Sequence, residues 1–155
     1  MSKVLSLVVS IFLFSSGFAR AQEDDQRPDY PRALAFFHQV QNALQQNDRA
    51  EISKLIEYPL LTRRHGQKHW IKTRTELLAN FDQIFDPGVR CALKRATDKD
   101  VWGNSSGFTV GLGAIWFDDV SPPGTNEDPN SPDFWTKGTF VIKTVNNETN
   151  FCDIK

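Results

Sequence analysis

The sequence contains few of the residues from which metal sites and nucleophilic centres are usually built. It has two cysteines, three histidines and one methionine among 155 residues. It also has no nucleophile elbow, no phosphate-binding glycine loop and no helical pair of metal-spaced histidines. The pattern indicates no enzyme class, so a non-catalytic protein is favoured, and neither a metal site nor a cofactor is expected.

The sequence also lacks an excess of positive charge. Eighteen lysines and arginines stand against nineteen aspartates and glutamates, which gives a formal net charge of −1. The basic residues are scattered, apart from the pair Arg63 and Arg64. A protein that binds nucleic acid usually gathers basic residues on one face. No nucleic-acid partner is therefore expected.

Long hydrophobic runs are absent except near the N-terminus. Residues 4–14, VLSLVVSIFLF, follow Lys3 and are too few to span a bilayer. The small residues of Ala19-Arg20-Ala21 follow this run, so residues 1–21 are predicted to be a cleavable signal peptide. No cysteine follows the cleavage site, which argues against a lipoprotein. The predicted location is secreted or periplasmic, without stable membrane insertion; an N-terminal membrane anchor is the alternative.

Two cysteines, Cys91 and Cys152, are the simplest candidates for a disulfide in an exported protein. Such a bond closes a loop of about 60 residues, for which the chain-entropy model gives about 4 kcal/mol. Two free thiols and a metal site are the alternatives. No histidine lies close in sequence to either cysteine, which disfavours the metal site.

Residues 22–31 are polar and contain two prolines, so they are predicted to be a flexible lead-in to a single domain over residues 32–155. The domain opens with apolar residues at helical spacing: Ala33, Phe36, Phe37, Val40, Ala43 and Leu44. Asp48 and Glu51 predict the cap of a second helix, which Pro59 is expected to end.

A short hairpin is predicted next, with strands at residues 59–62 and 67–72. The spacing of Thr73 and Glu76 predicts the cap of a third helix that continues through Phe85. Pro87 begins a fourth helix, which contains Cys91. Arg63, His65, Gln67 and His69 form either a polar wall on the hairpin or an exposed surface.

The longest strand signal lies at residues 105–119, SSGFTVGLGAIWFDD. Alternation places Phe108, Val110, Leu112, Ala114 and Trp116 on one face, with Gly111 and Gly113 on the other. The two glycines are expected to bend this strand. A short strand is predicted before it at residues 101–104, and two more are predicted after it at residues 134–145 and 149–154, beyond an acidic, proline-rich loop at residues 118–133. The order of elements predicts an α+β fold with helices packed on an antiparallel sheet.

Several of these segments resemble the nuclear transport factor 2-like superfamily of cone-shaped α+β proteins. They are Glu57-Tyr58-Pro59-Leu60, Trp70-Ile71-Lys72, the run from Glu76 to Phe85, and the run from Asn104 to Trp116. The resemblance implies a strongly bent sheet that wraps a helix and leaves a pocket at the mouth of the cone. Because the superfamily includes enzymes, ligand binders and structural modules, it does not fix the function.

Aromatic residues of the strands are the candidates for lining that pocket, since aromatic walls suit small-molecule ligands. The candidate ligand-binding residues are Trp102, Trp116, Phe117, Trp135 and His69. The favoured hypothesis is a non-catalytic domain that binds a small molecule or a protein partner. The alternatives are a small hydrolase or isomerase, and an inhibitor or immunity protein that inserts the 118–133 loop into a secreted enzyme. Whether the chain forms a homodimer is left open.

Overall fold

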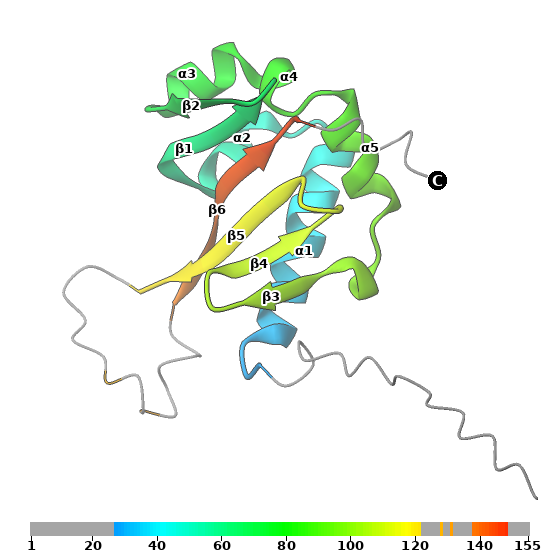
Figure 1. Ribbon diagram of the computed structural model, residues 1–155, viewed down its shortest axis with the longest axis vertical. Coiled ribbons are helices and arrows are strands. Elements are labelled where there is room, and N and C mark those ends of the chain that lie inside the picture. Colours follow the sequence, from blue (N-terminus) through cyan, green and yellow to red (C-terminus); the bar gives the residue numbers. More distant parts are fainter. Residues whose placement is uncertain (1–26, 122–127, 129–130, 132–137, 149–155) are drawn as a thin grey trace, which may run out of the picture.

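The computed structural model describes residues 27–121, 128, 131 and 138–148. Figure 1 shows them as one sheet with helices behind it. In chain order the elements are α1 (Tyr30–Gln45), α2 (Arg49–Lys54), β1 (Ile56–Arg64), β2 (Gln67–Ile71), α3 (Arg74–Ala79), α4 (Phe81–Ile84), α5 (Pro87–Arg95), the 3₁₀ helix η2 (Asp98–Asp100), β3 (Trp102–Asn104), β4 (Gly107–Val110), β5 (Ile115–Val120) and β6 (Thr139–Asn146). The α+β class is confirmed.

The six strands form one sheet in the order β2-β1-β6-β5-β4-β3. Strands β3 to β6 are consecutive antiparallel neighbours, as the predicted meander requires. Strand β1, however, pairs with β6 in parallel, so the expected wholly antiparallel sheet is wrong at this junction. Strand β6 runs antiparallel to its neighbour β5. Strand β1 comes from a distant part of the chain and pairs with the other edge of β6 in the parallel direction.

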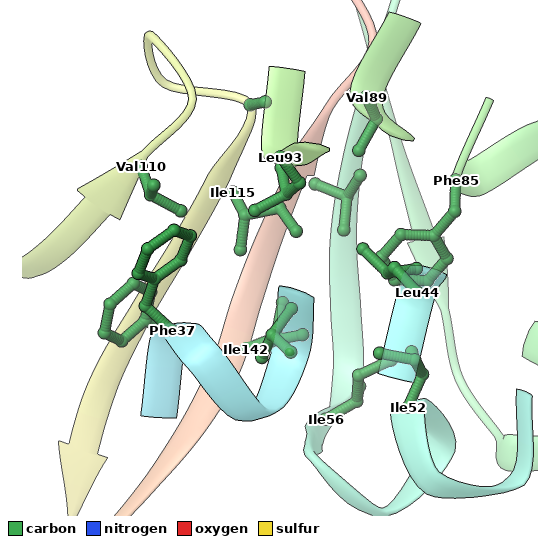
Figure 2. Close-up of a cluster of buried hydrophobic side chains, with 14 of the residues drawn as sticks. Phe37, Leu44, Ile52, Ile56, Phe85, Val89, Leu93, Val110, Ile115 and Ile142 are labelled. Atoms are coloured by element: carbon green, nitrogen blue, oxygen red, sulfur yellow. The ribbon is translucent and has the colours of Figure 1, made fainter. Parts of the chain in front are cut away.

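Helix α1 packs its apolar stripe against one face of the sheet, as its spacing predicted. All six stripe residues are buried. The ring of Phe36 lies 5.1 Å from that of Phe117 in β5 and 5.8 Å from that of Phe140 in β6. Figure 2 shows further parts of this core, where Phe37 lies near Val110. The interior beneath α1 is therefore filled by aromatic side chains.

The segment before α1 is docked where the structure describes it. Asp29 is fully buried and accepts two hydrogen bonds from the guanidinium of Arg27, at 3.0 and 2.6 Å. The same guanidinium lies 4.1 Å from the centre of the Phe108 ring. Helix α1 begins at Tyr30, so the last residues of the predicted lead-in belong to the packed domain.

Helix α2 begins as predicted but ends earlier. The side chain of Asp48 accepts a hydrogen bond from the Glu51 amide, which forms the expected cap. The helix stops at Lys54, and Ile56 already pairs with Ile142 in the sheet. Pairing with β6 thus takes residues 56–58 into a long strand, and the prediction that the helix reaches Pro59 is wrong.

The predicted third helix is two short helices, α3 and α4, which meet at Asn80. The Asn80 side-chain amide donates to the Glu76 carbonyl at 2.9 Å, and its backbone amide uses the same acceptor at 3.2 Å. Asparagine competes in this way with regular helical bonding. The predicted Thr73 cap and the start of α5 at Pro87 are both confirmed.

The predicted central strand is a hairpin made by β4 and β5. The Ala114 amide donates to the Gly111 carbonyl at 3.1 Å, which closes the turn between them. Leu112 and Gly113 both have positive φ, 59° and 92°, as a type I′ turn requires. The glycines therefore reverse the chain, and the prediction that they only bend one strand is wrong.

Because of this turn, the residues of β5 point to the faces opposite to those that the predicted alternation gave them. Val110 pairs with Ile115, so the two side chains lie on the same face although they are five positions apart. A continuous strand would place residues five positions apart on opposite faces. Phe108 instead pairs with Phe117, and their buried rings stack at 5.8 Å. Trp116 lies opposite Thr109, on the face away from the helices. The prediction that Trp116 shares a face with Phe108 is wrong.

Within the part of the chain that the structure describes, no helix is both long and apolar enough to cross a membrane. The predicted signal peptide and the predicted strand at 149–154 lie outside the described residues, as does most of the 118–133 loop. These three predictions stay open.

Candidate ligand-binding site

The five predicted ligand-binding residues do not form one site. Trp102 and Trp116 do lie together, with ring centres 5.6 Å apart in an edge-to-face arrangement on the outer face of the sheet. Phe117 is buried in the core on the other face. His69 is exposed in β2, and Trp135 lies outside the described residues.

The β1–β2 hairpin does place polar side chains on one face, but with a different membership from the predicted wall. His69 pairs with Thr62, and Gln67 pairs with Arg64. Successive strand residues point to opposite faces, so Arg64 shares the face of His69 and Arg63 does not. His65 lies in the turn with φ of 51°. Arg64 thus takes the place that the sequence analysis gave to Arg63.

These side chains border a hollow of about 360 Å³ between the hairpin and helices α3 and α4, which we call the hairpin notch. Its lining comes from four elements of the fold and from the residue after β6. The lining residues are Thr62, Arg64, His69, Trp70, Ile71, Glu76, Asn80, Gln83, Ile84 and Asn147. The notch lies beside the filled core, so a ligand enters it from solvent without displacing core side chains.

Two amides of the hairpin notch are held by the ends of the helices around them. Asn80 donates its side-chain NH₂ to the Glu76 carbonyl at 2.9 Å. Asn147 donates its NH₂ to the Ile84 carbonyl at 2.6 Å. These hydrogen bonds fix the orientation of each amide, and the amide oxygen of each remains available to a ligand.

Three further polar groups of the notch make no hydrogen bond or ion pair with any residue that the structure describes: the guanidinium of Arg64, the imidazole of His69 and the side-chain amide of Gln83. Glu76 is partly engaged, since one carboxylate oxygen accepts from the Lys72 amide at 2.8 Å. Trp70, which is 53% exposed, also borders the hollow, but it pairs with Leu61, and the alternation along β2 turns its side chain to the face opposite to that of His69. Such a set of polar groups without hydrogen-bond partners can hold a small polar molecule.

A second hollow lies on the outer face of the sheet. It has about 310 Å³ and is lined by Arg63, Trp116, Thr144 and Asn146. A third, of about 480 Å³, lies beside α1, where the imidazole of His38 contacts the carboxylate of Asp98 at 2.6 Å. The carboxylate and the imidazole bind each other, so the third hollow offers a ligand fewer unpaired polar groups than the hairpin notch does.

Catalytic residues are not indicated by the described interior. All three histidines are exposed. The buried polar residues are Asp29, Ser53, Thr62 and Thr109, and Asp29 is paired with Arg27. Asp82 is exposed and forms ion pairs with Arg49 and Arg90. No group of three or more potential metal ligands occurs among the described residues.

Cys91 is half-buried on α5, and no described cysteine is a free thiol. Its predicted partner Cys152 lies outside the described residues. The pairing therefore stays a prediction.

Comparisons with family models, with curated proteins and with solved structures give no match for this chain.

Of the residues that line the notch, His69 and the polar character of the hairpin were predicted from sequence, whereas Arg64, Gln83 and the two asparagines were not. A hairpin with the two-residue turn His65-Gly66 sets Gln67 opposite Arg64, and that pairing would have selected Arg64. Glu76, Asn80 and Gln83 stand at i, i+4 and i+7, so the helical spacing of this segment was a signal that could have grouped them on one face. Asn147 reaches the notch because β6 lies beside β1.

Proposed function

We propose that the protein is a non-catalytic, secreted or periplasmic domain that binds a small molecule in the hairpin notch. The observation that carries this proposal is the convergence of Arg64, His69 and Gln83 on a hollow of about 360 Å³, with no partner for any of them among the described residues. A hollow of this size falls in the range of small-molecule sites.

The cone-like fold of the nuclear transport factor 2-like superfamily is proposed for the same chain. What supports it is the order of elements: a helix pair, a hairpin, further helices and a four-stranded meander in one sheet. In this chain the space beneath α1 is occupied by side chains such as Phe36 and Phe117. The ligand site is therefore placed in the hairpin notch and not beneath α1.

A thermal-shift screen with metabolites and envelope components tests the binding proposal. A ligand that stabilises the protein raises its melting temperature by mass action. We expect at least one compound to stabilise the wild type and the Arg63→Ala variant, and to lose this effect in Arg64→Ala. Stabilisation that is equal in both variants would place the ligand elsewhere and reject the proposed site.

The two alternatives have less support. The inhibitor hypothesis depends on the 118–133 loop, most of which lies outside the described residues. Its test is a pull-down with and without that loop, and unchanged capture rejects it. The enzyme hypothesis needs an inward Asp, His or Tyr. Among the described residues the one fully buried carboxylate, Asp29, is held by Arg27.

A further inference from the structure

We propose that the exposed edge of strand β2 binds an acidic, extended peptide segment of a partner protein by strand addition. This inference goes beyond the proposed function and concerns a different class of ligand. It follows from three features of the β1–β2 hairpin: backbone groups without partners, basic side chains without partners, and an exposed tryptophan.

In the described sheet, strand β2 lies at one edge, beside β1 (Figure 1). The hairpin turn between these strands has two residues, so Arg64 and Gln67 form a hydrogen-bonded pair. Hydrogen-bonded and non-hydrogen-bonded pairs alternate along an antiparallel hairpin. The peptide groups of Lys68 and Trp70 therefore point away from β1, towards solvent.

The hydrogen bonds of neighbouring residues agree with this alternation. Arg63, which lies opposite Lys68, turns its carbonyl away from β2 and accepts from the residue after β6 at 2.7 Å. Lys72, two positions after Trp70, turns its amide to the outer edge, where the Glu76 carboxylate accepts from it at 2.8 Å. The amides and carbonyls of Lys68 and Trp70 make no hydrogen bond with a described residue. Two donors and two acceptors are thus unpaired along this edge, as an added strand requires.

The opposite edge of the sheet, strand β3, is partly covered. The Arg27 guanidinium donates to the Asn104 carbonyl, and the Tyr30 hydroxyl donates to the Val101 carbonyl at 3.4 Å. Strand β3 is also only three residues long. Among the described strands, the β2 edge is therefore the better place for an added strand.

The hairpin and the turn after it carry positive charge without negative charge. Between Glu57 and Glu76 the sequence has no aspartate or glutamate. None of the basic residues in this segment forms an ion pair with a described residue; they are Arg63, Arg64, Lys68, Lys72 and Arg74. Basic residues that do contact a carboxylate lie elsewhere: Arg27, Arg32, Arg49, Lys54, Arg90 and Lys143. The charge beside the β2 edge therefore favours an acidic partner.

The side chains of the edge specify the partner further. Lys68 and Trp70 lie two positions apart, so both point to the outer face of the sheet, where Leu61 lies opposite Trp70. Trp70 is 53% exposed. An added strand would place one residue beside each of them on the same face, and an acidic residue beside Lys68 and an apolar one beside Trp70 match them. Lysine on an edge strand also opposes pairing with apolar or basic strands.

A nucleic acid fits this edge less well than a peptide does. Phosphate oxygens accept hydrogen bonds, so they can pair with the amides of Lys68 and Trp70 but leave the two carbonyls without a donor. A peptide strand presents both a donor and an acceptor at every second residue. The alternating backbone groups of β2 therefore favour a peptide.

The test is a titration of the purified chain with a blocked peptide, Thr-Glu-Thr-Val-Thr-Glu-Thr. One control peptide has lysine in place of both glutamates. Two others are N-methylated, either at glutamate and valine, whose amides would face β2, or at the threonines between them, whose amides would face away. Single-stranded oligothymidylate is the nucleic-acid probe. Binding is followed by calorimetry and by NMR of amide hydrogen exchange.

We expect the acidic peptide to bind and to slow exchange at the amides of Lys68 and Trp70, because both would become hydrogen-bonded. Methylation at glutamate and valine should abolish binding, and methylation at the threonines should leave it unchanged. The lysine peptide and the oligonucleotide should not bind.

Three variants test the side chains of the edge. Lys68→Glu should weaken binding of the acidic peptide about tenfold and allow the lysine peptide to bind, since it reverses the charge beside the added strand. Trp70→Ala should also weaken binding, since it removes apolar surface that the peptide covers. The matched control Lys94→Glu makes the same charge change at an exposed lysine of α5 and should leave the affinity unchanged.

Each contrary outcome overturns the inference. Equal binding of both N-methylated peptides would show attraction by charge without strand addition. Binding of the oligonucleotide but not of the peptide, lost in Lys68→Glu, would assign this surface to nucleic acid. Absence of binding by the acidic peptide at millimolar concentration would also reject strand addition. The hairpin notch is tested separately, through Arg64.

Discussion

Arg63 and Arg64 are consecutive residues of β1 and line hollows on opposite faces of the sheet. Arg64 borders the hairpin notch together with His69, whereas Arg63 borders the outer hollow together with Trp116. The alternation of side chains along a strand explains this separation. The pair therefore offers two variants of identical chemistry that test the two faces independently.

Truncation of two aromatic residues distinguishes the core from the surface. Phe117→Ala should lower the free energy of unfolding by about 3–5 kcal/mol, because the ring is buried among Phe36, Phe108 and Phe140. Trp102→Ala should cost about 1 kcal/mol or less, because Trp102 is 42% exposed and its ring contact is with Trp116. Denaturant unfolding measures both, and equal losses would contradict the assignment of Phe117 to the core.

The turn between β4 and β5 contains a side chain whose backbone is strained. Leu112 has φ of 59° and is 65% exposed, so its side chain contributes little packing to offset the strain. A left-handed conformation costs a residue with a Cβ about 1–2 kcal/mol, and glycine avoids this strain. Glycine also has more conformational freedom in the unfolded state, which offsets part of that stabilisation. Leu112→Gly should therefore stabilise the protein by about 0.5–1 kcal/mol.

The control for this turn is Leu112→Ala, which removes most of the side chain and keeps the Cβ. We expect its unfolding midpoint in denaturant to stay within error of the wild type. A glycine variant that is less stable than the alanine variant would show that the Leu112 side chain stabilises the turn.

Much of the fold was predictable from sequence because it depends on local signals. The stripe of α1, the Asp48 and Thr73 caps and the start of α5 each need only a few neighbouring residues. The errors at β1 arose where pairing between distant segments decided the outcome. Strand β6 draws residues 56–58 into β1, and no local pattern indicates that.

The candidate site was less predictable than the fold for the same reason. His69 was selected, but its neighbours in the notch come from α3, α4 and the end of β6. A period-two pattern across residues 108–116 also hid the turn, since Gly-Leu-Gly fits a bent strand as well as a type I′ turn. The side chains that share a face with Phe108 could only be assigned once the register of β4 and β5 was known.

Tyr58 is expected to make the free energy of unfolding depend on pH in the alkaline range. Burial raises the pKa of its phenol above the ordinary value of 10.0, and the charge of Arg74 opposes this in part. The neutral phenol also donates to the Ser53 carbonyl at 3.3 Å. A raised pKa means that the folded state holds the proton more tightly, so this contribution is present below about pH 10 and is lost as the pH rises further.

The variant Tyr58→Phe should remove this dependence. Its free energy of unfolding should fall less steeply than that of the wild type above pH 10, when both are measured in urea at a series of pH values. Parallel pH profiles for the two proteins would show that Tyr58 does not titrate differently in the folded and unfolded states.

The proposed disulfide between Cys91 and Cys152 is tested on protein purified without reductant. The intact mass should lie two hydrogens below that of the reduced chain, and neither cysteine should react with an alkylating reagent before reduction. Reduction should lower the melting temperature, because a crosslink over about 60 residues is worth about 4 kcal/mol in the chain-entropy model. Alkylation of both cysteines without reduction rules the bond out.

The central claim is that the ligand site is the hairpin notch and not the outer face of the sheet. The most direct measurement is a map of backbone amide NMR shifts, recorded while the first stabilising compound is titrated into the wild-type protein. A ligand in the hairpin notch should cause the largest changes at His69, Ile71 and Gln83, and these changes should be lost in Arg64→Ala but not in Arg63→Ala. Changes centred on Trp116 and Thr144, abolished by Arg63→Ala, would contradict it.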